Sequence, residues 1–236
     1  MMPIVILHGW NSQLSRWQAV VKQLEKLKIK VYLPALPGFN HQLLTKPYNT
    51  CDYVVWVKQY LEKKSIKRCI LIGHSLGGQI ACQLAAVNPQ LVAKLILINS
   101  AGIRPGITLK RLIFIPIAKI GKWFFSLKPI RPLQQPFRQL LYLAARESDY
   151  LKSSPLMRQT LIQVINEDQQ SSFTQISCPA LLIWGGQDRM TPLKYGRKIH
   201  SLISGSKLII FPSASHGLPF THSEALVKEI IRFINL

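Results

Sequence analysis

Short apolar segments alternate with helical segments along most of this chain of 236 residues. Each apolar segment is only a few residues long and rich in Ile, Leu or Val, which is typical of a strand buried on both faces of a sheet. Six of them are predicted strands: Ile4–Leu7, Lys30–Leu33, Arg68–Ile72, Lys94–Ile98, Ala180–Trp184 and Lys207–Phe211. Five other segments have helical periodicity: Leu14–Leu27, Asp52–Lys64, Leu76–Val87, Pro192–Ile203 and His222–Ile234. Strands that alternate with helices form βαβ units, so we expect an α/β fold with a mostly parallel sheet of about six strands and helices on both faces.

One long interval has no convincing buried strand. Between about Ile103 and Ser172, helical patterns are punctuated by six prolines. Such an insertion between two strands predicts a helical cap over one end of the sheet rather than an independent domain. We therefore divide the chain into a first part of the core, residues 1–102, a helical cap, residues 103–172, and a second part of the core, residues 173–236.

The chain is strongly basic, with 30 Lys and Arg, only 10 Asp and Glu, and a formal net charge of +20. This charge suits a nucleic acid, an anionic membrane surface or an acidic partner. The basic residues are scattered, however, with no basic tail, no helix with a basic stripe and no zinc-finger spacing. We therefore expect no specific nucleic-acid partner.

The sequence also bears on location. No apolar stretch approaches the ~18 residues of a membrane-spanning helix. The N-terminal segment has no basic region, and its apolar run is too short for a secretory signal. The four cysteines form no CxxC pair, as expected for reduced thiols. These features predict a cytoplasmic protein.

The strongest chemical signal is the GxSxG sequence Gly73-His74-Ser75-Leu76-Gly77. It stands directly after one predicted strand and directly before a predicted helix. A turn this tight strains the backbone of the central residue and lifts its side chain clear of the carboxyl end of the sheet. The glycines are needed because a Cβ there would collide with the neighbouring strand and helix. Ser75 is therefore the candidate nucleophile.

Serine is a poor nucleophile without a base, and two later loops supply the partners. Asp188 follows the strand Ala180–Trp184, and His216 follows the strand Lys207–Phe211. In this arrangement His216 takes the Ser75 proton, while Asp188 orients the imidazole and stabilises its charged form. The alternatives are that Asp188 only caps its own turn and that His216 is a solvated loop histidine.

An acyl-transfer site also needs donors for the developing oxyanion. The backbone N–H of Leu76, next to the nucleophile, is one candidate. The other is the backbone N–H of Trp10, in the turn after the first strand, where Gly9 permits the tight bend. We expect no cofactor and no metal, because no ligand spacing, phosphate loop or dinucleotide fingerprint is present.

Taken together, four segments resemble the α/β-hydrolase superfamily: His8-Gly9-Trp10, Gly73–Gly78, Gly185–Pro192 and Ser215-His216-Gly217. The resemblance covers roughly residues 3–102 and 173–236 and is strongest to small serine carboxylesterases, including the pimeloyl-ester hydrolases, and to C–C bond hydrolases. It implies a minimal α/β-hydrolase fold, since the chain opens at the family's third strand.

The resemblance implies a carboxylesterase-like enzyme, of the EC 3.1.1 type, which cleaves esters of small to medium acyl chains through an acyl-enzyme at Ser75. Hydrolysis of a C–C bond, a thioester or a lactone is the alternative reaction, and a non-catalytic ligand receptor is the alternative class. The amphipathic segment Leu109–Leu127 is expected to line the substrate pocket. A peripheral contact of the basic cap with an anionic membrane or an acidic carrier is a weaker expectation.

Overall fold

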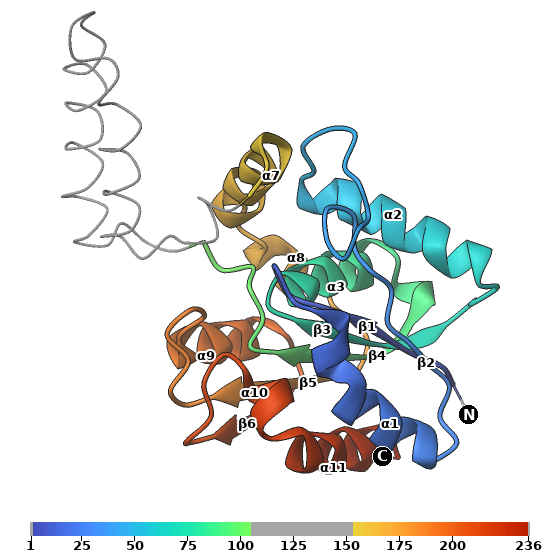
Figure 1. Ribbon diagram of the computed structural model, residues 1–236. Coiled ribbons are helices and arrows are strands. Elements are labelled where there is room, and N and C mark those ends of the chain that lie inside the picture. Colours follow the sequence, from blue (N-terminus) through green and yellow to red (C-terminus); the bar gives the residue numbers. More distant parts are fainter. Residues whose placement is uncertain (1, 105–152, 236) are drawn as a thin grey trace, which may run out of the picture. The chain divides into compact units, whose positions relative to one another are not determined.

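The computed structural model describes residues 2–104 and 153–235 (Figure 1). The chain forms two compact units, one comprising Met1–Arg104 with Glu167–Leu236 and the other comprising Pro105–Asn166. We call the first the core unit. Of the second unit, the structure describes residues 153–166, which contain helix α7 (Pro155–Asn166).

The core unit is built on one six-stranded sheet with the strand order β2-β1-β3-β4-β5-β6, and each neighbouring pair is parallel. This confirms the predicted α/β fold with a parallel sheet of about six strands. The strands are β1 (Ile4–Leu7), β2 (Val31–Tyr32), β3 (Cys69–His74), β4 (Val92–Ile98), β5 (Ala180–Gly185) and β6 (Lys207–Phe211). All six predicted strands exist, with shifts of one or two residues at some ends.

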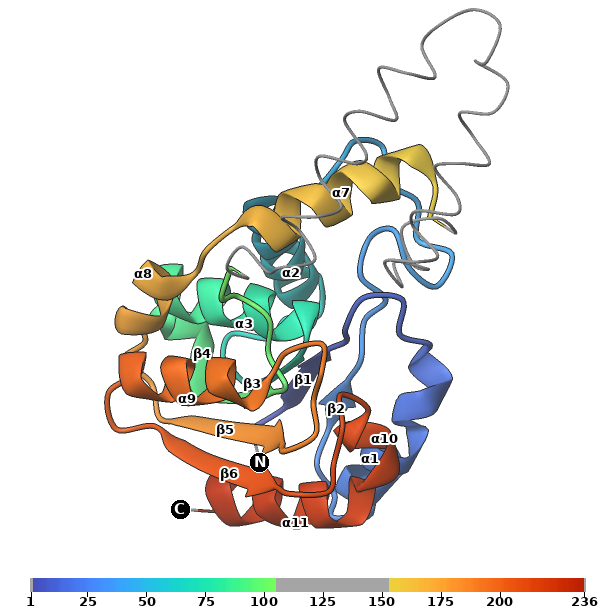
Figure 2. The ribbon, with the colours of Figure 1, turned by 90° about the vertical axis from the view of Figure 1, so that its left-hand side faces the viewer.

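Helices cover both faces of the sheet (Figure 2). Helices α1 (Gln18–Lys26) and α11 (Ser223–Ile234) pack together on one face, together with the short α10 (Leu218–Thr221). The other face carries α2 (Thr50–Lys63), α3 (Leu76–Val87), α8 (Gln170–Thr174) and α9 (Leu193–Leu202). Two short 3₁₀ helices, η1 (Leu14–Trp17) and η2 (Pro89–Leu91), complete the described elements.

The central strands are buried on both faces, which explains their continuous apolar sequences. Ile4 and Ile6 of β1 belong to the core cluster formed with α1 and α11. Val5 and Leu7, whose side chains alternate with these, are also fully buried. Because a strand of this kind is apolar at every position, its sequence could be recognised without knowledge of its neighbours.

Two of the predicted helices differ from the structure by more than one residue at an end. The segment Leu14–Leu27 divides into η1 and α1 rather than forming one helix. Helix α2 begins at Thr50, earlier than predicted, because Asn49 and Asp52 form a capping box. The Asn49 side chain accepts a hydrogen bond from the Asp52 N–H, and the Asp52 carboxylate accepts one from the Asn49 N–H.

The predicted cap can be compared with the structure only in part. Residues 167–172 lie in the core unit, since α8 packs against α3 and α9. The amphipathic segment Leu109–Leu127 lies outside the described residues, so the proposed role of the cap stays a prediction. Within residues 2–104 and 153–235, no helix has the length and apolar character needed to span a membrane.

Candidate active site

Ser75 occupies a sharp turn between β3 and α3. Its backbone has φ 54° and ψ −119°, a conformation that L-residues rarely adopt. The Ser75 carbonyl accepts hydrogen bonds from the N–H groups of Gly78 and Ala101, and the Ser75 N–H donates to Ile98. This turn carries the strained backbone that the GxSxG sequence predicts, and these bonds hold it in place.

The surrounding glycines allow the turn to approach the sheet closely. A Cβ on Gly77 would collide with the backbone carbonyls of Leu7 and His8, and one on Gly73 would collide with the Gly77 backbone. A Cβ on Gly9 would lie 3.0 Å from the Ser75 Cβ. The turn after β1 is therefore packed directly against the candidate nucleophile.

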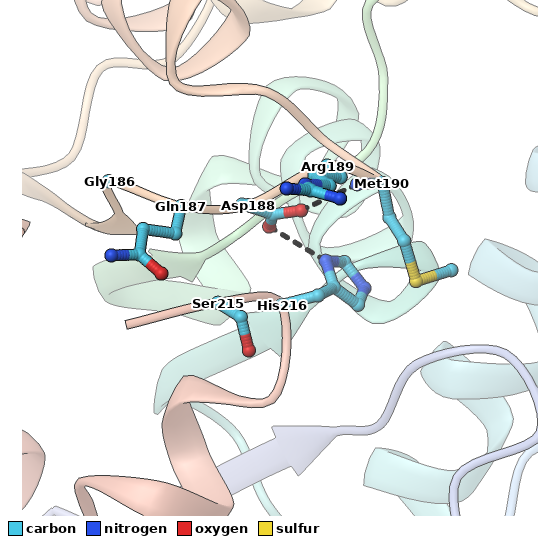
Figure 3. Close-up of a pocket in the computed structure, with 7 residues that line it drawn as sticks. All are labelled: Gly186, Gln187, Asp188, Arg189, Met190, Ser215 and His216. Atoms are coloured by element: carbon cyan, nitrogen blue, oxygen red, sulfur yellow. Dashed lines mark hydrogen bonds and ion pairs between the residues drawn. The ribbon is translucent and has the colours of Figure 1, made fainter. Parts of the chain in front are cut away.

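Asp188 and His216 come from the loops that follow β5 and β6, and their side chains are hydrogen-bonded. His216 Nδ1 lies 2.8 Å from Asp188 Oδ2, as the dashed line in Figure 3 shows. The Asp188 side chain is fully buried, whereas 17% of the His216 side chain is exposed. With Nδ1 engaged by the carboxylate, the Nε2 atom of His216 is the ring nitrogen available to accept a proton.

Asp188 also caps its own turn. Its Oδ1 accepts hydrogen bonds from the N–H groups of Met190 at 2.8 Å and Thr191 at 2.9 Å. The two interpretations of Asp188 offered by the sequence are therefore compatible, since one carboxylate oxygen closes the turn and the other contacts His216. The turn fixes the direction in which the second oxygen points.

The electrostatic environment keeps Asp188 ionised. Burial by itself raises the pKa of a carboxyl group, but the hydrogen bond and charge of His216, together with the Thr191 hydrogen bonds, outweigh burial. The pKa of Asp188 is consequently lowered. An ionised Asp188 can stabilise a positive charge on His216, as a base of this kind requires.

A cavity of about 610 Å³ opens beside this pair (Figure 3). It is lined by Gly186, Gln187, Asp188, Arg189, Met190, Ser215 and His216. These residues belong to the loops after β5 and β6, so the cavity lies at the carboxyl end of the sheet, where ligands bind in open α/β folds.

One proposed oxyanion donor belongs to the residue after Ser75, and the other belongs to the turn after β1, which packs against Ser75. Leu76 is the first residue of α3, so its N–H has no acceptor within the helix. Trp10 is inside a turn closed by the hydrogen bond from the Ser12 N–H to the Gly9 carbonyl, which leaves the Trp10 N–H unused by that turn. The buried His8 supports this loop, since its Nδ1 donates to the Gly9 carbonyl and its Nε2 accepts from the Leu36 N–H.

His74 connects the turn at Ser75 to the loop that carries His216. Its ring is buried, its Nε2 donates to the His216 carbonyl at 2.9 Å, and the two rings lie 4.9 Å apart. Burial lowers the pKa of His74 to about 3, so the ring is neutral at ordinary pH.

Sequence reasoning missed two polar residues at this site, Asn99 and Thr191. Asn99 directly follows β4 and is fully buried, and its side chain reaches the end of β5 and the loop after β6. The Thr191 hydroxyl lies 2.8 Å from Asp188 Oδ2. A polar residue at the carboxyl end of a central strand was the available signal for Asn99. For Thr191 the signal was its position three residues after an Asp.

Comparisons with known proteins agree with this architecture. A family model described as the alpha/beta hydrolase fold matches residues 2–113. The pimeloyl-[acyl-carrier protein] methyl ester esterase of Aliivibrio fischeri is 24% identical over 250 residues, covering 98% of this chain and 93% of its own. Among solved structures, the enol-lactonase of Burkholderia xenovorans has a TM-score of 0.76 at 21% identity, covering all of this chain and 92% of its own. The bromoperoxidase of Bacillus anthracis has a TM-score of 0.77 at 19% identity, with the same coverage.

Proposed function

Because the chain belongs to the α/β-hydrolase superfamily, we propose that it is a serine hydrolase that cleaves carboxylic esters of small to medium acyl chains. The observation that carries the proposal is the 2.8 Å contact between Asp188 and His216, at the same end of the sheet as the strained Ser75. A serine raised on such a turn, a histidine and a carboxylate are the three groups that acyl transfer by a serine requires.

The proposed reaction proceeds through an acyl-enzyme. His216 Nε2 takes the proton of the Ser75 hydroxyl as the oxygen attacks the ester carbonyl, and the buried, ionised Asp188 stabilises the resulting imidazolium. The N–H groups of Leu76 and Trp10 stabilise the oxyanion. His216 then protonates the leaving alcohol, and later activates the water that releases the acid and restores Ser75.

The bromoperoxidase and enol-lactonase neighbours support the fold alone, while the esterase relative favours ester cleavage. Reactions at a C–C bond, a thioester or a lactone would use the same three side chains. The substrate pocket, rather than Ser75, Asp188 and His216, therefore determines which bond is cleaved. We also propose a cytoplasmic location, supported by four free cysteines, Cys51, Cys69, Cys82 and Cys178.

The decisive experiment compares the wild-type protein with Ser75→Ala on a panel of nitrophenyl esters of increasing acyl length, together with a lactone, a thioester and a dioxo-acid. We expect turnover of the short esters and its loss in Ser75→Ala. Covalent labelling of Ser75 by a fluorophosphonate checks the nucleophile independently of the substrate. Full activity in Ser75→Ala would overturn the mechanism, and labelling without turnover of any panel member would favour a ligand receptor.

A further inference from the structure

Asn99 lies at the carboxyl end of β4 and is hydrogen-bonded to both loops that carry Asp188 and His216. It is fully buried and has a backbone φ of 44°. Asn is one of the few residues other than glycine that tolerate this left-handed conformation. Its backbone N–H donates to the Ile183 carbonyl in the neighbouring strand, which fixes the residue to the sheet.

Both the nitrogen and the oxygen of the Asn99 side-chain amide are hydrogen-bonded. Its Nδ2 donates to the carbonyls of Ser215 at 3.0 Å and His216 at 3.1 Å, and its Oδ1 accepts from the Gly185 N–H at 2.8 Å. One side chain therefore joins the end of the strand that leads to Asp188 to the loop that presents His216.

The backbone carbonyl of Asn99 also contacts the turn that carries Asp188. The Thr191 hydroxyl lies 3.0 Å from the Asn99 carbonyl oxygen and 2.8 Å from Asp188 Oδ2, so its single proton can be donated to either oxygen. Asn99 is thus linked to both residues of the Asp188–His216 pair. It contacts the His216 backbone directly, and it is linked to Asp188 through the Thr191 hydroxyl.

A second side chain acts on the same carbonyl. The His216 oxygen accepts from Asn99 Nδ2 and also from His74 Nε2 at 2.9 Å. A carbonyl oxygen has two lone pairs, so these two donors satisfy it fully. His74 ends β3 and Asn99 follows β4, and these strands are hydrogen-bonded neighbours. The position of the His216 backbone is consequently set by two rigid elements rather than by its own loop.

We propose that Asn99 is a positioning residue which, with His74, holds the His216 backbone so that Nδ1 stays on Asp188 and Nε2 stays available to take the Ser75 proton. The proposal rests on the proposed serine hydrolase function. The physical reason is that Asp188 and His216 come from separate loops, and loops are more mobile than strands unless hydrogen bonds attach them to the sheet. A shift of about 1 Å in a reacting group can cost on the order of 10²-fold in rate.

Two variants test this role. Asn99→Gly removes the amide but keeps a residue that accepts φ 44°, so it separates the lost hydrogen bonds from backbone strain. Asn99→Asp keeps the size and the acceptor for Gly185, but it turns an oxygen toward the carbonyls of Ser215 and His216. Asn88→Asp is the matched control, since it makes the same chemical change at the far end of α3.

The readouts are kcat and KM per active site, titrated with a fluorophosphonate, and the pH profile of kcat/KM on the best ester of the panel. We expect kcat to fall by on the order of 10²-fold in Asn99→Gly and further in Asn99→Asp, with KM changed by less than about 3-fold. We expect the acid limb of the pH profile to move in both variants and to stay in place in Asn88→Asp. Thermal unfolding of each variant checks that it is folded.

A readout independent of turnover separates this proposal from the proposed function. In ¹⁵N-labelled protein the Nδ1 proton of His216, bonded to Asp188, should give a downfield resonance that disappears or shifts in Asn99→Gly and stays in Asn88→Asp. A wild-type resonance that responds in this way supports the positioning role even if no ester is hydrolysed. An Asn99→Gly protein with the wild-type resonance, kcat and pH profile, whatever its melting temperature, would show that Asn99 is only a buried structural residue.

Discussion

Gly9 packs against Ser75 so closely that a single added carbon on Gly9 would lie 3.0 Å from the Ser75 Cβ. The same carbon would lie 2.9 Å from Nδ1 of the buried His74. Within the described part of the chain, that nitrogen is the buried side-chain polar atom without a hydrogen-bond partner. The turn after β1, the Ser75 turn and the His74 ring therefore meet at Gly9.

Gly9→Ala should reduce activity without unfolding the protein. The added methyl group forces either the turn that carries the Trp10 N–H or Ser75 to move, and misplacing an oxyanion donor costs ~10²–10³-fold in kcat. Steady-state kinetics on the best nitrophenyl ester measures the effect. Gly217→Ala is the control, because the nearest atom to its new Cβ is 3.8 Å away. Equal activity in the two variants would contradict the packing argument.

Two substitutions at Ser75 distinguish the chemical role of its hydroxyl group from the strain in its backbone. Both Ser75→Ala and Ser75→Gly remove the hydroxyl and should be inactive, but only glycine adopts φ 54° without cost. We expect Ser75→Gly to be more stable than Ser75→Ala by about 1 kcal/mol, the reverse of the order at an ordinary helical position. Urea unfolding of the two proteins measures the difference. The usual order, with alanine the more stable, would argue against strain at this turn.

The buried His74 should make stability depend on pH. Its pKa is lowered to about 3 in the folded protein, mainly by burial, from an ordinary value near 6.5. The unfolded chain therefore binds a proton that the folded chain does not, and stability is full above pH 6.5 and falls between pH 6.5 and 3. At pH 5 this loss amounts to roughly 2 kcal/mol.

Unfolding by urea at pH 7 and pH 5 measures this loss. In His74→Asn the difference between the two pH values should shrink, although not to zero, because burial also lowers the pKa of His8. His41→Asn, at an exposed position, is the control and should behave like the wild-type protein. An unchanged pH dependence in His74→Asn would mean that the ring is not held neutral by the fold.

The capping box of α2 gives a prediction that concerns stability alone. Asn49→Ala removes the side-chain oxygen that accepts from the Asp52 N–H at 2.8 Å. We expect a loss of about 1 kcal/mol in the free energy of unfolding, with kcat of the folded protein unchanged. Gln59→Ala, at an exposed position within the same helix, should cost much less. A loss in Gln59→Ala as large as in Asn49→Ala would assign the effect to the helix surface rather than to the cap.

Much of the fold was readable from the sequence because its signals are local. A strand buried on both faces is apolar at every position, as in Ile4–Leu7, and needs no partner to be recognised. The turn at Ser75 could also be recognised locally. The three residues on either side of Ser75 include both glycines of the motif, the end of the strand and the start of the helix. The split of Leu14–Leu27 into η1 and α1 was not readable, because apolar spacing does not distinguish a 3₁₀ turn from the first turn of an α-helix.

By itself, the sequence determined the parallel sheet and the candidates Ser75, Asp188 and His216, since motif and strand order place each of them at the end of a strand. Only the tertiary structure decided what holds these candidates. Asn99 meets His216 across 117 positions of the chain, and Thr191 meets Asn99 across 92. A hydrogen bond over such a separation leaves no periodic pattern in the sequence, because it depends on two loops being brought to one edge of the sheet. Apolar burial is encoded residue by residue, whereas the direction of a polar side chain is set by its neighbours in the folded protein.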